Sequence, residues 1–557
     1  MSARRGRQRG RRMRWVAVFA SALCLVGLSG CAMLPTSGAV HRVTVSADTD
    51  TDARYVINAS GPASGASRTE IVQGFLAAGA DSANGYETAR EFLTSSAAAA
   101  WQPESQVTVV ESTPSQSTGA SASQITASAH EIGLVDAVGE YQQSDRQFSE
   151  SFHLVRVEGQ WRIDSVPTGT VITRGNFQLV FAGRRLPFLD ETGQRFVADV
   201  RWFPVGASTA TRVVSALLQG PSAQLRGSVL TAIPEGTRLA VDAVATSGKT
   251  TTVTLSSEAL SDDARQVNRM FAQIQAALAE VPGTGTLRLL SGTTELRPAS
   301  DTESPSWPQV GSSGLLVRSG DGAISAYEGG IRGKSLRSAL NRIGQGEGFS
   351  VWGDVAATAL SDGTLRRVRG TTVLSSASAQ AGGSVWLDAD GWAWQLASGK
   401  VTAWPSQGSS VSLQGEGMSA FALAPDGVRA AWLVPNADGS HTDVVFGVVQ
   451  RSSQGAPQSL SSGVTVATVD GTPGSLTWVG ANVAVATRSG NTSPVSVVGV
   501  NGVVSTLTPL EPVRELAGGD TSDSLRVLTD TGILYSPRGT GWVRLRTGIR
   551  NIAYSWN

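Results

Sequence analysis

The stretch that decides the fold of this chain is FALAPDGVRAAWLVP, residues 421–435. Two short apolar runs, 421–424 and 430–434, stand on either side of Asp426-Gly427. Short apolar runs bounded by turn residues are typical of buried strands. Asp-Gly tolerates the positive φ angles that a tight turn between antiparallel strands requires. The stretch therefore predicts a β-hairpin with both strands in a core.

Turn pairs of the same kind recur from about residue 311 to the end, at intervals of 28 to 44 residues. They are Asp321-Gly322, Asp362-Gly363, Asp390-Gly391, Asp426-Gly427, Asp470-Gly471 and Asn501-Gly502. These intervals are near the length of one propeller blade, and residues 421–433 resemble a WD40 or TolB-type blade. We therefore predict an all-β propeller over residues 304–557, with at most six or seven blades. A pair of packed sheets in a β-sandwich is the alternative architecture.

The preceding segment, residues 177–303, alternates between helical and strand patterns. A helix is expected over 212–219, ended by Gly220-Pro221, and a strand over 250–256. A long helix follows, with Val267, Met270, Phe271, Ile274 and Leu278 on one face at steps of 3, 1, 3 and 4. We expect Phe271 to lie in the core of this α/β unit.

Residues 58–176 predict a small α+β domain. Helices are expected near 71–76 and over 86–100, followed by strands near 130–137, 148–157 and 160–166. Glu158-Gly159-Gln160 stands between the last two strands as a hairpin turn. Two helices followed by a curved sheet resemble the NTF2-like fold, for which we favour an interaction role over a ligand pocket.

The first 31 residues have the pattern of an export signal. Seven arginines occur within the first fourteen residues, and an apolar run follows over 15–28. Residues 1–30 therefore predict a signal peptide, and Leu28, Ser29 and Gly30 predict the recognition site of a signal peptidase. The next residue, Cys31, is the predicted lipidation site, carrying an S-diacylglycerol and an N-acyl group. An ordinary signal peptide cut elsewhere is the alternative.

Lipidation of Cys31 explains the cysteine count. Cys24 lies within the predicted signal, so the processed chain would contain a single thiol, which in an exported protein calls for an explanation. Two or three acyl chains hold a protein stably on a membrane, whereas one chain does not. We therefore expect residues 31–57 to be a lipidated N-terminus and tether, and the protein to lie on the extracytoplasmic face of the cell membrane.

Composition excludes some partners. Removal of the predicted signal would leave 38 basic residues against 45 acidic ones, a net charge near −7. An acidic chain is a poor ligand for nucleic acid, which proteins bind largely through Lys and Arg contacts to phosphate. We therefore expect no nucleic-acid partner.

Motifs of enzyme chemistry are weak. The four histidines, at 41, 130, 153 and 441, are scattered and include no HExxH pattern, so no metal site is predicted. Gly248-Lys249-Thr250 and Gly333-Lys334-Ser335 lack the first glycine of a phosphate-binding loop. The acidic pairs Asp262-Asp263 and Asp388/Asp390 are interpreted as helix caps and turns.

Several stretches together resemble one family, the actinobacterial LpqB lipoproteins. They are Gly61-Pro62, QWRI at 160–163, FVADVRW at 196–202, LLQGP at 217–221, IPEGT at 233–237 and VTLS at 253–256. The last three also resemble the GerMN domain. The resemblance implies the order NTF2-like domain, GerMN domain, propeller. It also implies an accessory role in two-component signalling: binding to the extracellular domain of an MtrB-type sensor kinase, with effects on division and envelope homeostasis.

Two other functions remain open at this stage. One is binding of cell-wall carbohydrate or a peptidoglycan fragment, with several of the 14 tryptophans at the propeller mouth. The other is hydrolysis by two carboxylates in the propeller channel, about 5–9 Å apart. We favour a binding protein without catalytic residues or cofactor.

Overall fold

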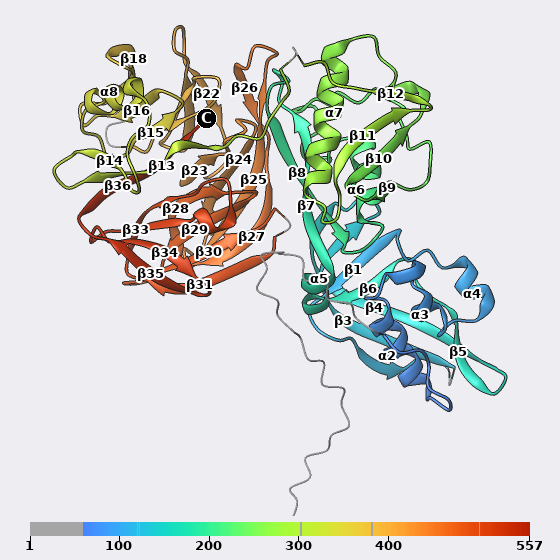
Figure 1. Cartoon of the computed structure of the whole chain (residues 1–557). Helices are drawn as coiled ribbons and strands as arrows, with labels where there is room; N and C mark the ends of the chain where they lie inside the picture. Colours follow the sequence, from blue (N-terminus) through green and yellow to red (C-terminus); the bar gives the residue numbers. More distant parts are fainter. Residues whose placement is uncertain (1–58, 120, 122, 301–302, 380–382, 501) are drawn as a thin grey trace, which may run out of the picture. The chain divides into compact units, whose positions relative to one another are not determined.

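The computed structural model describes residues 59–119, 121, 123–300, 303–379, 383–500 and 502–557 (Figure 1). The predicted signal peptide, with Leu28, Ser29 and Gly30, and the whole of the predicted lipidated N-terminus and tether, residues 31–57 with Cys31, lie outside these residues. Among the described helices, none is both long enough and apolar enough to cross a membrane.

The first region is a six-stranded sheet with helices. The strand order is β5-β4-β3-β1-β6, with β2 paired to β3, and only β1 and β6 run parallel. Residues of α2 and of the strands share one core, which includes Phe75, Phe152 and Ile163. Its elements are α2 Arg68–Ala78, α3 Glu87–Arg90, α4 Ser95–Ala100, β1 Gln106–Val110, β2 Ser115–Thr118, β3 Gln124–Asp136, β4 Tyr141–Val157, β5 Gln160–Ser165, β6 Thr170–Thr173 and α5 Arg174–Val180.

The hairpin predicted at residues 158–160 is confirmed. Val157 of β4 pairs with Gln160 of β5. Glu158 and Gly159 between them have φ angles of 50° and 78°. Two consecutive positive φ angles define the turn whose twist matches that of the flanking strands.

The single helix predicted over 86–100 is wrong, because two short helices, α3 and α4, occupy this segment. Between them the chain turns and then pairs with β5 at Leu93: Ile163 N–H donates to Phe92 O and Thr94 N–H donates to Ile163 O, each at 2.9 Å. Thr94 then caps α4, its hydroxyl accepting a hydrogen bond from Ala97 N–H. The break satisfies the backbone groups at the edge of the sheet, which a continuous helix could not do.

The second region combines two antiparallel strands, two helices and a four-stranded sheet of order β12-β11-β10-β9. Strands β10 and β11 are parallel, and α7 connects them. Strands β11 and β12 form an antiparallel hairpin around Ser291-Gly292. The elements are β7 Phe181–Leu189, β8 Phe196–Pro204, α6 Thr209–Leu218, β9 Ala245–Ser247, β10 Thr250–Leu255, α7 Ala264–Ala279, β11 Thr286–Ser291 and β12 Thr294–Leu296.

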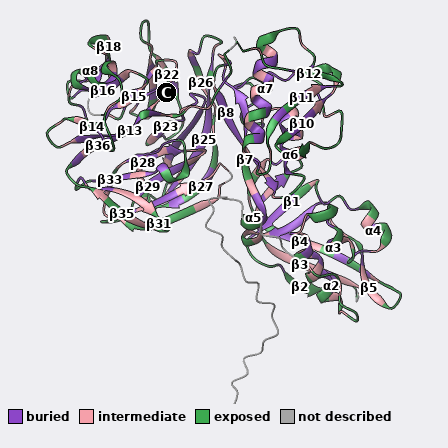
Figure 2. Cartoon of the chain, in the orientation of Figure 1, coloured by how far each residue is buried: buried purple, intermediate pink, exposed green. Residues whose placement is uncertain are grey.

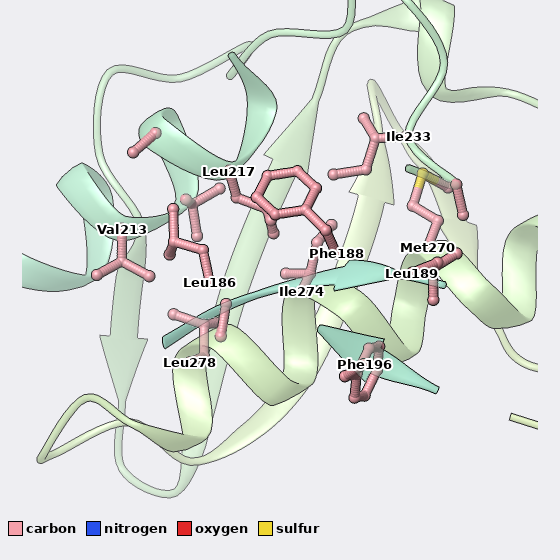
Figure 3. Packing of buried hydrophobic residues seen from close by; sticks show 14 of the residues in the cluster. Leu186, Phe188, Leu189, Phe196, Val213, Leu217, Ile233, Met270, Ile274 and Leu278 are labelled. Carbon is pink, nitrogen blue, oxygen red and sulfur yellow. The ribbon is translucent and has the colours of Figure 1, made fainter. Parts of the chain in front are cut away.

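Helix α7 lies at the centre of this region (Figure 3). Met270, Ile274 and Leu278 are buried against residues of β7 and α6. Phe271, expected in the core, lies at the core's margin and is only half-buried. Successive helical residues are rotated by about 100°, so a face centred near Met270 and Ile274 leaves Phe271 at its edge.

The third region is a propeller. Its four-stranded antiparallel blades are β15–β18, β19–β22, β23–β26, β28–β31 and β32–β35, and β36, β13 and β14 form a sixth, three-stranded blade. The first of these blades joins the sixth because β15 pairs with β36. In addition β27 pairs with β25.

The bounds of the propeller elements are β13 Val310–Ser319, β14 Ile324–Ala326, α8 Lys334–Arg342, β15 Ser350–Trp352, β16 Val355–Ala359, β17 Thr364–Arg369, β18 Thr372–Ser378, β19 Trp386–Leu387, β20 Ala393–Ala397, β21 Lys400–Trp404, β22 Val411–Gln414, β23 Ala420–Leu423, β24 Arg429–Pro435, β25 His441–Arg451, β26 Pro457–Leu460, β27 Val464–Asp470, β28 Thr472–Val479, β29 Asn482–Arg488, β30 Ser493–Val498, β31 Val504–Leu510, β32 Val513–Ala517, β33 Arg526–Thr529, β34 Leu534–Arg538, β35 Gly541–Arg546 and β36 Ile549–Trp556.

The ring closes through strands far apart in the chain. Near the start of the region β13 pairs antiparallel with β36, at the end of the chain. Strand β36 also pairs parallel with β15, where Trp352 is the partner of Trp556. Burial follows the blades: β23 and β24 are mostly buried, whereas the outer strands β31 and β35 are not (Figure 2).

The hairpin predicted at residues 421–435 is β23–β24. Leu423 pairs with Ala430, and Gly427 takes the expected positive φ, 75°. The Asp426 carboxylate accepts hydrogen bonds from the backbone N–H groups of Val428 and Arg429, both at 3.0 Å. The aspartate thus satisfies turn donors that the strands leave unpaired.

Candidate functional site

The innermost strands of the blades surround a channel of about 330 Å³. Strands β15, β19, β23, β28, β32 and β36 all contribute to its lining. It includes four tryptophans: Trp352, Trp386, Trp478 and Trp556.

Three of these tryptophans offer surface to the channel. Trp352, Trp386 and Trp556 are half-buried. The rings of Trp352 and Trp556 are nearly parallel, 15° between planes, with centroids 6.3 Å apart. Trp386 meets the ring of Phe421 edge-on at 5.9 Å. Trp478 is 4% exposed and donates its indole N–H to Ala422 O, so its role is structural.

One carboxyl group lines the channel in the described part of the chain, that of Glu515 on β32. Its Oε2 accepts hydrogen bonds from Ile552 N–H at 3.1 Å and from the Asn551 amide at 3.5 Å. Burial raises the pKa of Glu515 to about 7, although these hydrogen bonds and the nearby Arg318 and Arg514 act in the opposite direction. The group therefore titrates near neutral pH.

Arg318 of β13 is a buried cation behind the channel wall. Its guanidinium donates to Gly346 O at 2.6 Å and to Gly344 O at 3.3 Å, and lies 5.1 Å from the ring centroid of Phe349. Burial lowers the pKa of Arg318 from its usual value. Arginine stays protonated at neutral pH even after such a shift, so a fixed positive charge acts on the Glu515 carboxyl.

Asp388 and Asp390 form the turn that their sequence pattern predicted. They also belong to an ionic cluster. The Asp388 carboxylate accepts hydrogen bonds from Asp390 N–H and Trp392 N–H. Arg451 of β25 pairs with Asp388 at 2.6 Å and with Asp390 at 3.2 Å. Arg195 of the second region reaches the same Asp390.

This cluster connects the second region to the propeller, which belong to the same compact unit. Burial raises the pKa of Asp390 against the effect of Arg195 and Arg451. Partnered charges of this kind stay together because separating them would leave a buried ion uncompensated. The sequence analysis missed both arginines, since nothing local marks them as partners of Asp390.

The other candidates from sequence are not assembled into a site. The described histidines lie on different strands, His130 on β3, His153 on β4 and His441 on β25, each beside an aspartate; His41 lies outside the described residues. Within those residues no group of three His, Cys, Asp or Glu side chains could hold a metal ion. Asp263 caps α7 by accepting a hydrogen bond from Arg265 N–H.

The two Gly-Lys-Ser/Thr stretches have structural places. Gly248 stands in the turn between β9 and β10, with a φ of 59°. Gly333 precedes α8, and Ser335 in its first turn donates to the Asp354 carboxylate at 3.0 Å.

A second candidate surface lies on the first region, where two arginines lie over the ring of Trp161 of β5. Arg156 is 4.8 Å and Arg68 is 5.5 Å from the ring centroid of Trp161. Val157, which precedes the hairpin turn, is 44% exposed, and Arg162 donates to Trp161 O at 2.7 Å. We call these five residues the Trp161 surface.

The fold defines a multidomain protein in which two α+β regions precede a β-propeller. Three family models match in that order: the LpqB lipoprotein N-terminal domain at residues 61–178, a sporulation and spore germination domain at 186–296, and the LpqB β-propeller domain at 353–552. The chain belongs to the LpqB family of lipoproteins.

Curated relatives support this assignment. Lipoprotein LpqB of Streptomyces coelicolor is 32% identical over 53% of this chain and 52% of its own length. Lipoprotein LpqB of Cutibacterium acnes is 30% identical over 50% of this chain and 46% of its own length. The chain spans about half the length of the curated relatives it matches.

Solved structures give more distant matches. TolB from Acinetobacter baumannii is 16% identical, with a TM-score of 0.21, over 36% of this chain and 67% of that one. A hydrazine synthase from Kuenenia stuttgartiensis is 13% identical, with a TM-score of 0.27, over 40% of this chain and 75% of that one.

Proposed function

We propose that this protein is a lipid-anchored accessory protein of a two-component system. Held at the extracytoplasmic face of the membrane through Cys31, it binds the extracellular domain of an MtrB-type sensor kinase. Binding modulates signalling to the response regulator, and through it cell division and envelope homeostasis. Membership of the LpqB family supports the lipoprotein part of this proposal. The resemblance described under the sequence supports the choice of the sensor kinase as partner.

The observation that carries the proposal is the Trp161 surface. Tryptophan and arginine are the residues that most often dominate the binding energy of protein interfaces. Here the guanidinium groups of Arg68 and Arg156 both lie over the Trp161 ring, so its orientation is set before a partner arrives. Preorganised side chains lose less conformational entropy on binding, and the Trp161 surface is therefore our candidate contact for the kinase.

Its position in the chain suits a membrane-bound partner. Residues 32–58 separate Cys31 from the described part of the first region. A chain of this length reaches at most about 95 Å, at roughly 3.5 Å per residue. A kinase sensor domain on the same membrane lies within such a distance, and confinement raises the effective concentration of the two partners.

The lining of the channel favours binding over hydrolysis. Two-carboxylate glycoside hydrolysis needs an acid and a second carboxylate on either side of the bond. The described lining contributes Glu515 alone, which supports a protein that recognises its partners without turning them over.

The test is a titration of the purified sensor domain into the full-length lipoprotein in detergent micelles. We expect direct binding with a Kd of roughly micromolar order. Trp161→Ala should weaken it at least about tenfold, a loss of about 1.4 kcal/mol, because the stacked ring is the centre of the contact. Trp542→Ala, on the outer strand β35, is the matched control and should leave the Kd unchanged.

Two results would count against the proposal. Absence of any association with the sensor domain would remove the accessory function itself. Binding that is equally strong in Trp161→Ala and in the wild type would keep the partner but reject the Trp161 surface as the contact.

A further inference from the structure

We propose that the propeller channel is a carbohydrate-binding site that takes the pyranose rings of an envelope glycan, one or two sugar residues at a time. The site lies wholly within the propeller, and it does not depend on the kinase partner proposed above.

The aromatic part of the site is the pair Trp352 and Trp556 together with Trp386. One face of a pyranose ring presents only C–H groups, which pack on an indole ring as an apolar surface. No described residue accepts a hydrogen bond from the indole N–H of any of the three, so these donors are available to a ligand. The rings of Trp352 and Trp556 are stacked on each other and held by the β15–β36 pairing, so their orientation in the channel wall is fixed.

The polar part of the site faces the same space. Glu515 uses Oε2 for the backbone and amide contacts given above, and no described residue donates to its Oε1. Ser350 and Ser475 each accept one backbone N–H, from Leu387 and Leu516, both at 3.0 Å. Each hydroxyl keeps its own proton to donate. Donors and acceptors set around an aromatic platform are what a ligand rich in hydroxyl groups requires.

Electrostatics favours a neutral sugar over an organic cation, the other ligand class that aromatic rings bind. Arg318 and Arg514 both act on the Glu515 carboxyl, although Arg514 also pairs with Asp530 at 3.8 Å. With one carboxyl in the described lining and the Arg318 cation acting on it, the channel has no excess negative charge to attract a cation. The volume, about 330 Å³, is at the small end of the range for ligand pockets, about 300–1,000 Å³, which restricts the ligand to a short saccharide unit.

The experiment is saturation-transfer difference NMR with calorimetric titration on the full-length lipoprotein. The detergent must carry no sugar headgroup, since a glycoside detergent would compete for the channel. The probes are maltose, cellobiose and the peptidoglycan disaccharide of N-acetylglucosamine and N-acetylmuramic acid, with choline as the cation probe. We expect saturable binding of at least one sugar, with the strongest transfer to C–H protons on one face of its ring, and no binding of choline.

Two channel variants and one control locate the site. Trp556→Ala should lower the sugar affinity at least about tenfold, whereas Trp542→Ala should stay within about twofold of the wild type. Because Trp556→Ala removes a half-buried side chain and could disturb folding, Glu515→Gln is the second variant. It keeps the size of the side chain and loses the charged acceptor at pH 8, which should lower the affinity about fivefold, since charged acceptors make the stronger hydrogen bonds.

Three outcomes would overturn the inference. The first is that no sugar saturates the protein up to about 100 mM, where any remaining affinity is negligible. The second is equal sugar affinity in the wild type and in both channel variants. The third is binding of choline in place of the sugars. None of them bears on the sensor domain, so failure here is distinguishable from failure of the kinase contact.

Discussion

At the scale of single residues, Glu515 is the most unusual group in the described part of the chain. Its carboxyl lines the channel and is held by Ile552 N–H and Asn551, yet burial raises its pKa to about 7. In an unfolded chain a glutamate titrates near 4.3. Folding therefore binds a proton between these two values, and the folded state is most favoured when the carboxyl is protonated.

This shift predicts a pH dependence of stability. The contribution of Glu515 is fully present below about pH 4.3 and falls as pH rises through about 7, by at most about 4 kcal/mol. Glu515→Gln mimics the protonated form, so its free energy of unfolding should fall less than that of the wild type between pH 5 and 8. Urea unfolding at a series of pH values measures both slopes. Parallel slopes for the two proteins would show that Glu515 is ionised with an ordinary pKa.

At the scale of elements, α7 shows how a helix can be placed correctly and its face misassigned by a fraction of a turn. The apolar spacing predicted the helix, but the buried face also includes the polar Gln273. The Gln273 amide donates to Pro187 O at 2.8 Å and accepts from Ala232 N–H at 2.8 Å. A buried amide that satisfies two separate backbone segments rotates the helix toward itself and leaves Phe271 at the margin.

The two apolar neighbours on α7 should therefore differ in their effect on stability. Met270 is fully buried, so Met270→Ala should lower the free energy of unfolding of the second region by about 2–5 kcal/mol. Phe271→Ala should lower this free energy of unfolding by less than half as much, although it removes a larger side chain. Chemical denaturation, followed by hydrogen exchange of the α7 amides, compares them. A greater loss for Phe271→Ala would restore the original prediction that Phe271 lies in the core.

At the scale of the whole molecule, the described regions are joined by specific contacts, and the anchor lies outside them. Arg195 reaches Asp390 of the propeller, and the core of the second region extends to Val428 and Val448. The Arg201 side chain pairs with Glu140 of the first region at 3.3 Å. Tethering at Cys31 would thus carry three connected regions, the Trp161 surface and the channel among them.

The anchor itself is tested by Cys31→Ala. The thiol is the nucleophile that a diacylglycerol transfer requires, so the variant should take up no labelled lipid and should leave the membrane fraction or stay unprocessed. Metabolic labelling with a tagged fatty acid, followed by fractionation, measures both. Cys24→Ala, which removes the other thiol of the sequence outside the predicted recognition site, is the control and should be labelled normally. Lipid incorporation in Cys31→Ala at the wild-type level would reject the anchor.

Local sequence determined the elements of this protein and much of their order. Asp426-Gly427 specifies its hairpin because an aspartate and a residue tolerant of positive φ satisfy the turn without outside help. The apolar spacing along α7 also specifies a helix without outside help, because all the residues of the pattern lie within a few helical turns of one another. Recurrence of the turn pairs predicted the propeller, and the described blades confirm it.

Only the tertiary structure decided the sites. Trp352 and Trp556 become neighbours because the last strand of the chain pairs with β15, and Glu515 lines the same channel because the blades are arranged in a ring. Arg195 finds Asp390 across two regions. Each of these arrangements brings together residues far apart in sequence, so no local sequence pattern predicts it. They exist because closing the ring of blades brings the innermost strands of all six around one axis.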